Sequence, residues 1–544
     1  MLTVVQPSPV LPDAAFASIE KELKTIDLAP LVNASYSIQV TSNTDTLWEA
    51  YHSAENYNKT RPGVMKVDGD SQYRIASITK TFTVLGILYQ HAAGNLSLDD
   101  SIQKYIPELA ADDQQLPWKD ITLRILASQL SGIPREFAQS DLLMEYGDPT
   151  KFGLPPISSK RVAPCYRDEQ PATCNRTDLI RHLKKQQPVF APNQFSTYSN
   201  VAFELLGLAI ENATGMGYSE YIDQAIFQPL NMTLSSLDTP PDTHAVLPTG
   251  DNYWDSEEGV QRPTGGIYAS ASDMSNYVRY VLTHFNTLAT GVNWLLPASP
   301  ASGVHSFYGM PWEIFRTERL LEDSTRPVTF VTKSGSLPGY YSRISVLPEY
   351  GLGVTILVSA NPKLVEQLQE IVTVSLVRAA ENEVWKSLEQ THGGSYVAID
   401  EQLNSSISFS ASPSGGLTVT NFISNGTDEL GFVFPTFFLP LLDIGDLPWR
   451  VQLMPTLLYK NETSQQGEIW RMLVLPEEPN DKSSRPVWDD FCIANVEYVS
   501  YGGLPFNEVV FWLEDGIVEL PAWRVKLKKR EAGKGLVDQT HLDL

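Results

Sequence analysis

The apolar and polar positions between Tyr73 and Gly94 follow the spacing of an amphipathic helix, with Gly94 as a stop signal. Ser77 stands where this helix would begin, and Lys80, three residues later, shares its face. A helix start offers unpaired N–H groups and a positive dipole end, which favour negative charge developing on a serine oxygen. A lysine one turn away can take the serine proton if its pKa is lowered. The stretch predicts an S-x-x-K nucleophile, with an ordinary amphipathic helix as the alternative.

The patterns before and after this helix predict mixed structure in the first part of the chain. Residues 14–27 have helical spacing, and residues 34–51 alternate as a hairpin would, with a turn at Ser42–Asn43. Residues 121–136 predict a helix that Gly132 and Pro134 stop.

A second set of patterns runs from residue 195 to residue 388. A loop carries Tyr198 and Asn200, and an almost wholly apolar helix follows and closes at Gly215. Residues 265–282 predict a turn that leads into an amphipathic helix. Residues 327–362 then hold three β-rich runs divided by glycine turns, as in an antiparallel meander, and a long helix follows at about 363–388. Together these elements predict an α/β (α+β) domain, with an antiparallel sheet flanked by helices.

From about residue 393 the sequence pattern changes to short runs of alternating apolar and polar residues, which Gly, Asn and Ser divide. This pattern predicts a separate antiparallel barrel or sandwich. Because 544 residues exceed a single compact core, we expect two domains, at 1–390 and 391–544.

A long stretch at about 137–187, rich in Pro, Gly and charge, interrupts the first domain. Connections of this length are usually functional or disordered, so we expect a lid over a pocket, with a passive surface insertion as the alternative. The stretch contains Cys165 and Cys174, which form either a disulfide or two free thiols. Cys492 lies in an apolar setting that is typical of a buried thiol.

Charge and composition exclude several classes of function. The formal charge of −24 argues against a nucleic-acid partner, which would require a basic surface. The eight histidines are scattered, without metal-ligand spacing, so we expect no metal and no cofactor. The longest apolar run, 432–442, is too short to span a membrane and contains two prolines.

The compartment is contested by two features of the sequence. The N-terminal residues lack the basic start and unbroken apolar core of a signal peptide, which allows a cytoplasmic protein. The density of Asn-x-Ser/Thr sites favours a secretory ancestry and a glycoprotein instead. These sites are Asn33, Asn58, Asn95, Asn175, Asn212, Asn231, Asn404, Asn425 and Asn461.

Three separated motifs now fall in order along the chain: Ser77-Ile-Thr-Lys80, Tyr198-Ser-Asn200 and Lys333-Ser334-Gly335. On the basis of these motifs and of surrounding sequence segments such as LASQLSGIP and SGSLPGYYS, the chain at about residues 20–390 resembles the serine β-lactamase and penicillin-binding-protein superfamily. It is most similar to the class C β-lactamase and esterase branch. The resemblance implies a β-lactamase/transpeptidase-like fold. The C-terminal segment resembles the lipocalin-like domains attached to some esterases and aminopeptidases of this superfamily.

The resemblance also implies a role for each motif residue. Ser77 would be the acylated nucleophile, Lys80 the general base or the group that lowers its partner's pKa, and Tyr198 the proton relay. Asn200 would orient Lys80 and the acyl group, and Lys333 would supply positive charge beside Tyr198. Backbone N–H groups of Ser77 and Ser336 would form the oxyanion hole.

The same residues also have plain structural interpretations. Tyr198 could be a buried aromatic with a satisfied hydroxyl, Asn200 a helix cap, and Lys333 a solvated charge at a strand end. Two departures from the family pattern put β-lactam specificity in doubt. Ser334 stands where many β-lactamases have threonine, and the 137–187 insertion widens the spacing between the first two motifs.

We therefore expect a serine hydrolase that forms an acyl-enzyme on Ser77 from an ester, thioester, lactone or amide of a small molecule. An acyltransferase that passes the acyl group to a small metabolite is the first alternative. An inactive binding module that keeps the fold is the second. The intact Ser77, Lys80 and Tyr198 argue against the inactive module, and the sequence leaves the oligomeric state open.

Overall fold

The computed structural model describes residues 11–26, 31–110, 115–137, 142–145, 148–158, 173–442, 448–476, 496–497 and 499–530. The chain divides into two compact units. One comprises Pro12–Thr317 with Val328–Leu376, and the other contains Glu318–Pro327 with the described residues from Val377 onward. The expected boundary at residue 390 falls near the end of helix α11 (Pro362–Thr391) and stays a prediction.

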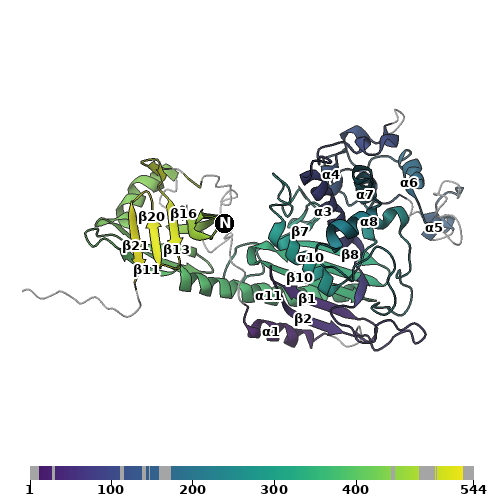
Figure 1. The fold of residues 1–544 in the computed structure, drawn as a ribbon, viewed down its shortest axis with the longest axis horizontal. Coiled ribbons are helices and arrows are strands. Elements are labelled where there is room, and N and C mark those ends of the chain that lie inside the picture. The colour runs from purple at the N-terminus through teal and green to yellow at the C-terminus, as the bar shows by residue number, and fades with distance from the viewer. Residues whose placement is uncertain are drawn as a thin grey trace, which may run out of the picture. The chain divides into compact units, whose positions relative to one another are not determined.

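An antiparallel sheet of eight strands forms the centre of the first unit, as the meander and hairpin patterns predicted (Figure 1). In spatial order its strands are β2 (Thr46–His52), β1 (Tyr36–Thr41), β10 (Leu352–Ser359), β9 (Tyr340–Leu347), β8 (Val328–Leu337), β7 (Glu313–Thr317), β6 (Ser306–Tyr308) and β5 (Ser299–Pro300). The predicted turn at Ser42–Asn43 joins β1 to β2.

Helices cover both faces of this sheet. Helix α10 (Ala271–His284) packs so closely on one face that a Cβ at Gly353 would lie 2.1 Å from Val278 Cγ1. Ser275 on this helix donates to Gln39. Gln39 faces α10, so the next residue on β1, Val40, points to the other face of the sheet, because successive strand residues alternate. Trp48 of β2 is the strand partner of Val40 and points to that same face. There Trp48 stacks on Phe16 of helix α1 (Asp13–Leu23), which runs along β2 in Figure 1.

The remainder of the first unit is a helical layer around α3 (Thr79–Ala92) and α7 (Val201–Thr214). The first ten residues of each helix are buried, which explains the almost wholly apolar sequence of α7. Pro263 of α9 (Arg262–Gly265) packs directly against Gly207 of α7. A Cβ on residue 207 would lie 2.2 Å from Cγ of Pro263, so this contact requires glycine. Helix α7 ends at Gly215 with φ +70°, as predicted.

The predicted helix at 121–136 is much shorter than its sequence pattern suggested. Helix α4 spans only Leu123–Ala127, and Gln129 already has φ +61°. Beyond it the chain forms backbone hydrogen bonds with the segment that leads into α7, from Thr197 N–H to Gln129 and from Asn200 N–H to Arg135. These long-range bonds replace the helical bonds that local spacing would have favoured.

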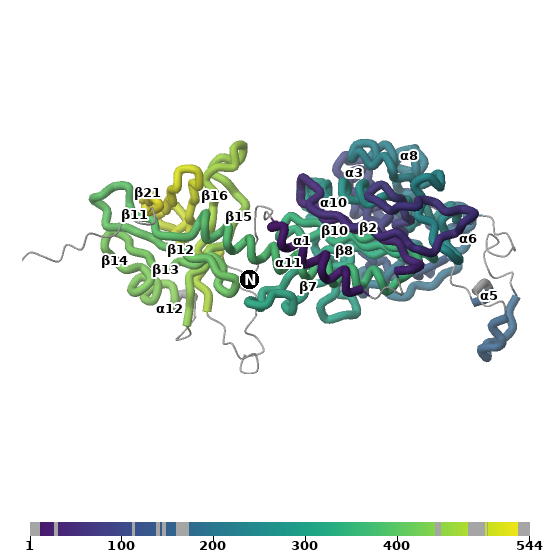
Figure 2. Tube along the Cα trace, turned by 90° about the horizontal axis from the view of Figure 1, so that it is seen from below, coloured from purple at the N-terminus to yellow at the C-terminus, as the bar shows by residue number. Residues whose placement is uncertain are grey.

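The second unit contains a nine-stranded antiparallel sheet, also as predicted (Figure 2). The strands in spatial order are β12 (Ser406–Ser412), β11 (Gly394–Ala398), β21 (Val525–Lys529), β20 (Ile517–Leu520), β19 (Glu508–Trp512), β16 (Gln466–Pro476), β15 (Trp449–Asn461), β13 (Gly416–Ser424) and β14 (Thr427–Asp428). Strand β13 pairs with β12 as well as β15, so eight of the strands close into a ring, which favours the barrel over the sandwich.

The predicted lid at 137–187 is described only in part. Its last section is not a mobile cover, because helix α6 (Arg176–Leu183) buries Leu179, Ile180 and Leu183 in the core of the first unit. Cys174 is in a disulfide, while Cys165 and Cys492 both lie outside the described residues. A lid is therefore still a prediction for the residues before Cys174.

No helix in the described ranges is long and apolar enough to cross a membrane. The most apolar run forms the π-helix η11 (Glu429–Phe438) and helix α12 (Leu439–Leu442) in the second unit.

Candidate active site

Ser77 lies in a short 3₁₀ turn, η1 (Ala76–Ile78), between strand β3 (Gln72–Arg74) and helix α3. The sequence predicted one helix from Ser77, whereas the structure begins it with this tighter turn. Ala76 has φ +48°, an uncommon conformation for a residue with a side chain. Hydrogen bonds to both polar backbone groups of Ile75 hold the turn: its N–H donates to Ile267 O at 3.0 Å and its carbonyl accepts from Ser342 Oγ at 2.8 Å.

Gly335 allows strand β8 to lie directly against this turn. A Cβ at position 335 would lie 2.2 Å from Ile75 O and 2.4 Å from Ser342 Oγ, so only glycine fits there. The close approach brings the third motif beside the first, although more than 250 residues separate them in sequence.

Lys80 is fully buried, and its amine contacts Ser77 directly. Lys80 Nζ donates to Ser77 Oγ at 3.0 Å and to Thr264 O at 2.8 Å. Burial lowers the pKa of Lys80, and the positive charge of Lys333 lowers it further. A lysine with a lowered pKa can be a neutral amine, which is the form that accepts a proton.

The ring of Tyr198 lies among three cationic side chains. Its centroid is 5.2 Å from Lys80 Nζ, 5.2 Å from Lys333 Nζ and 4.7 Å from Arg135 Cζ. Burial alone would raise the pKa of the Tyr198 phenol. The charges of Lys333 and Lys80, with a hydrogen bond from Ser77, outweigh burial and bring this pKa below its usual value.

Lys333 is buried and paired, which rules out the interpretation of a solvated strand-end charge. Its Nζ lies 2.5 Å from Glu313 Oε1, and Ser334 donates to Glu313 Oε2 through its N–H at 3.0 Å and its hydroxyl at 2.6 Å. Burial lowers the pKa of Lys333, but the charge of Glu313 outweighs it and raises the pKa overall. The pKa of Glu313 is depressed for the converse reason, because Lys333 outweighs burial.

Sequence reasoning missed Glu313, which no motif marks. It lies on β7, where it pairs with Thr332 next to Lys333, so only the strand register reveals it.

Asn200 is the residue before the first turn of α7, yet its side chain makes no capping bond, so the helix-cap alternative is wrong. Its Nδ2 donates instead to Glu136 Oε1 at 2.5 Å. Sequence reasoning also missed Glu136, which lies two residues after the Pro134 that was used as a helix stop.

Ser336 is exposed on β8 beyond the end of its pairing with β7. Ser334 N–H points to the β7 edge, where it donates to Glu313, and N–H groups two residues apart on a strand share an edge. The Ser336 N–H therefore points to the same edge, away from β9. All the predicted site residues thus come from η1, α3, β8 and the segment before α7.

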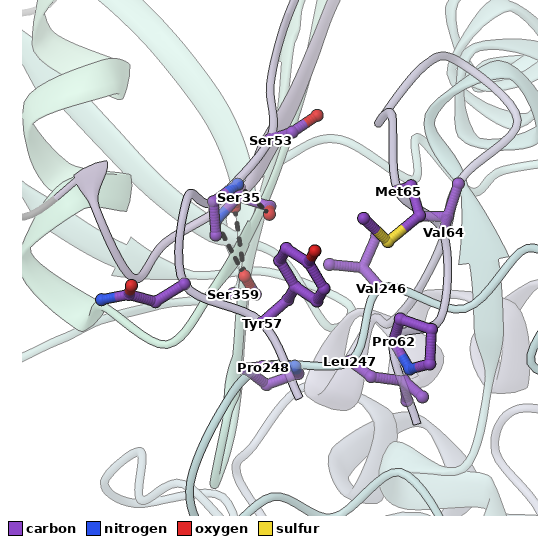
Figure 3. Close-up of a pocket in the computed structure, with 12 residues that line it drawn as sticks. Ser35, Ser53, Tyr57, Pro62, Val64, Met65, Val246, Leu247, Pro248 and Ser359 are labelled. Carbon is purple, nitrogen blue, oxygen red and sulfur yellow. Dashed lines mark hydrogen bonds between the residues drawn. The ribbon is translucent and has the colours of Figure 1, made fainter. Parts of the chain in front are cut away.

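A separate cavity lies near the ends of β1 and β10 (Figure 3). It is lined by Ser35, Ser359, Tyr57, Met65 and Val246, among others, and its volume is about 20 Å³. This is room for about one water molecule, so the cavity does not compete as a site for an acyl substrate. In the described ranges no three His, Cys, Asp or Glu side chains group as metal ligands would.

The fold and these motifs define a protein of the β-lactamase-like hydrolase class. The model of the family described as Beta-lactamase matches residues 30–378, and the chain belongs to this family, within the serine β-lactamase and penicillin-binding-protein superfamily. Residues 384–531 match a second model, described as "Beta-lactamase-like-like, C-terminal domain".

Relatives align over most of the chain. "Probable hydrolase M10" of Phoma sp. is 31% identical over 90% of this chain and 82% of its own length. "Beta-lactamase-like protein" of Arthroderma benhamiae is 29% identical over 91% and 86%. A solved class C β-lactamase superposes with a TM-score of 0.51 at 17% identity, covering 67% of this chain and 96% of its own, and shows the fold alone.

Proposed function

We propose that this protein is a serine hydrolase that forms an acyl-enzyme on Ser77. The observation that carries the proposal is the 3.0 Å hydrogen bond between Ser77 Oγ and the amine of Lys80, a buried lysine with a lowered pKa. An exposed lysine would be protonated at neutral pH and could not act as a base.

In the first half-reaction, Ser77 Oγ attacks the substrate carbonyl while its proton passes to Lys80 or to the Tyr198 phenolate. The lowered pKa values of both groups suit them to this task. The proton then moves to the leaving group as the carbonyl–heteroatom bond breaks, which leaves the acyl group on Ser77. Water, activated by the same groups, releases the acid in the second half-reaction.

The remaining site residues support these steps without exchanging protons. Two backbone N–H groups supply the oxyanion hole: that of Ser77, in a first helical turn, and that of Ser336, on the open strand edge. Lys333, whose pKa is raised by Glu313, stays charged and keeps the Tyr198 pKa low. Ser334 and Gly335 place this strand beside the acyl group.

Fluorophosphonate labelling with intact-mass analysis tests the proposal. One phosphonyl adduct is expected, mapping to Ser77, and Ser77→Ala should abolish both labelling and ester turnover. Ser97→Ala, a serine outside the site, is the control and should label as the wild type does. An adduct on any other serine would contradict the assignment.

The products formed from this acyl-enzyme distinguish a hydrolase from an acyltransferase. Short-chain esters, thioesters and lactams are offered with and without an added alcohol or amine. Release of free acid alone supports the hydrolase, and preferential formation of the new ester or amide supports the transferase.

A further inference from the structure

Glu136 is a carboxylate at the site that none of the three motifs contains. Only 13% of its side chain is exposed, and its Oε1 accepts from Asn200 Nδ2 at 2.5 Å. The Nε of Arg135 lies 3.2 Å from the same oxygen. Burial raises the pKa of Glu136, while Asn200, Arg135 and Lys80 counter this. In its ionised form the carboxylate offers only acceptors, and Asn200 then turns its NH₂ group toward Glu136 and its Oδ1 the other way.

The backbone around this contact is held on both sides. Asn200 N–H donates to Arg135 O at 2.8 Å, and Ser199 Oγ donates to Pro134 O at 2.8 Å. With the two segments fixed, the rotation of the Asn200 amide about its own side-chain bond is the freedom that remains. Glu136 restricts that rotation.

Asn200 Oδ1 is buried and has no hydrogen-bond partner among the described residues. A buried acceptor without a donor costs free energy, so the reacting groups are expected to supply one. Lys80 is suited to this, because once it has accepted the Ser77 proton its ammonium form has three N–H donors, and its contacts with Ser77 and Thr264 use two of them. The residues flanking this position also contact Lys80, whose Nζ is 5.2 Å from the Tyr198 ring and 5.4 Å from the Phe203 ring.

We propose that Glu136 is a positioning residue whose carboxylate fixes the Asn200 amide so that Oδ1 faces the Lys80 amine and the acyl group. The inference rests on the proposed function and adds to it a residue that acts only through Asn200. When Glu136 is protonated it also becomes a donor, and the orientation is no longer enforced.

The charged groups that face Glu136 come from three elements. Arg135 pairs with it from the same turn, Lys80 approaches from α3, and Glu204 lies on α7. Neither carboxylate oxygen of Glu204 has a hydrogen-bond partner in the described part of the chain. Burial and the charge of Glu136 raise the pKa of Glu204 well above its usual value.

Two substitutions of similar size test the proposal through the second-order rate of Ser77 phosphonylation. Glu136→Leu removes the acceptor and should slow labelling by about 10- to 100-fold, the usual effect of losing a hydrogen bond to a charged group. Glu136→Gln keeps an acceptor but adds a donor, so its rate should fall between those of wild type and Glu136→Leu. Glu220→Gln, on the exposed surface of α8 (Tyr218–Ile222), is the charge-matched control and should keep the wild-type rate.

Repeating both substitutions in an Asn200→Ala background separates positioning from a structural effect. If Glu136 acts through Asn200, either substitution should change the rate by less than about twofold there. A wild-type rate for Glu136→Leu, or an undiminished effect in the Asn200→Ala background, would overturn the proposal. If Glu136→Leu does not fold, the Glu136→Gln pair decides by the same criterion. A wild-type protein that never labels on Ser77 would instead disprove the proposed function, and this inference with it.

Discussion

At the scale of single residues, the site combines side chains that would each be unremarkable alone. Lys80 and Lys333 are both buried lysines, yet their pKa values move in opposite directions. The difference follows from their partners, since Lys80 contacts a hydroxyl and a carbonyl, whereas Lys333 contacts the carboxylate of Glu313. One lysine is thereby suited to accept a proton and the other to remain a fixed positive charge.

Tyr198→Phe should show whether Tyr198 is an acid–base group in catalysis or only a buried aromatic residue of the fold. The substitution removes only a hydroxyl, so the melting temperature should stay near that of the wild type. Loss of a positioned acid–base group should lower kcat by a factor of about 10² to 10⁴, or about 3 to 5 kcal/mol of barrier. Steady-state kinetics on the best ester, with thermal melting, measure both.

Lys80→Met provides the comparison for that experiment. It should lower kcat similarly, and the double variant should lose less than the product of the two single losses, because the residues act as one unit. If Tyr198→Phe stays within a few-fold of the wild type, Tyr198 is a core aromatic rather than a proton relay.

Asp273 makes stability depend on pH. It is buried at the start of α10, and burial raises its pKa to about 6 from 3.8, although Leu234 N–H and Ser235 Oγ donate to it. The native state thus favours the protonated acid. The associated stability is fully present below about pH 4 and is lost as pH rises through 6.

The stability of Asp273→Asn relative to that of the wild type should therefore increase as pH rises. The wild type's free energy of unfolding, relative to that of the variant, should fall by about 3 kcal/mol between pH 4 and pH 7. Urea titrations of both proteins measure it, and groups that titrate in both cancel. A difference that does not change with pH would contradict the raised pKa.

At the scale of elements, a buried ion pair stabilises the second half of α11. Arg326 lies in the short Glu318–Pro327 segment, and its Nη2 is 2.6 Å from Oε2 of Glu381 on α11. Both side chains are almost fully buried. Trp385 Nε1 donates to the other oxygen of Glu381 at 2.9 Å.

Arg326→Met should cost about 3 to 5 kcal/mol of unfolding free energy, because it removes the positive partner of a buried carboxylate. The double variant with Glu381→Leu should recover much of that loss, since a buried pair is often replaceable by apolar side chains. Chemical denaturation of the single and double variants tests this. Equal losses in both would mean that packing, and not charge, is what Arg326 contributes.

The predicted lid also belongs at this scale. Residues 148–158, within the 137–187 insertion, expose Phe152, Leu154 and Ile157, so little folding energy depends on them. Shortening this section should change KM or substrate-size preference more than the melting temperature, if it covers the pocket mouth. Assays over esters of increasing acyl length measure the first quantity. Unfolding without a shift in selectivity would show that the section is structural.

At the scale of the whole molecule, each unit has its own core. The first surrounds α3 and α7, and the second contains an aromatic cluster in which Phe511 contacts Phe409, Trp470 and His392. Units with separate cores commonly unfold separately.

Calorimetry should therefore show two unfolding transitions. Phosphonylation of Ser77 should shift only the transition of the first unit, because Ser77 belongs to that unit. Ser77→Ala treated with the same reagent is the control and should show no shift. A single cooperative transition that moves as a whole would contradict the expected division at about residue 390.

The sequence by itself determined the features that depend on local spacing. The β8–β9–β10 meander, the α7 helix with its Gly215 stop and the antiparallel C-terminal strands follow from periodicity and turn residues, which act over a few positions. The three motifs were identifiable because each is short and contiguous.

Only the tertiary structure decided what lies between those motifs. The 121–136 helix ends early because long-range backbone bonds to the segment before α7 compete with local ones. Glu313 and Glu136 lie far in sequence from the lysine and the asparagine that they contact, so no spacing marks them. The opposite pKa shifts of Lys80 and Lys333 likewise depend on burial and on partners that exist only once β7, β8 and α3 have packed together.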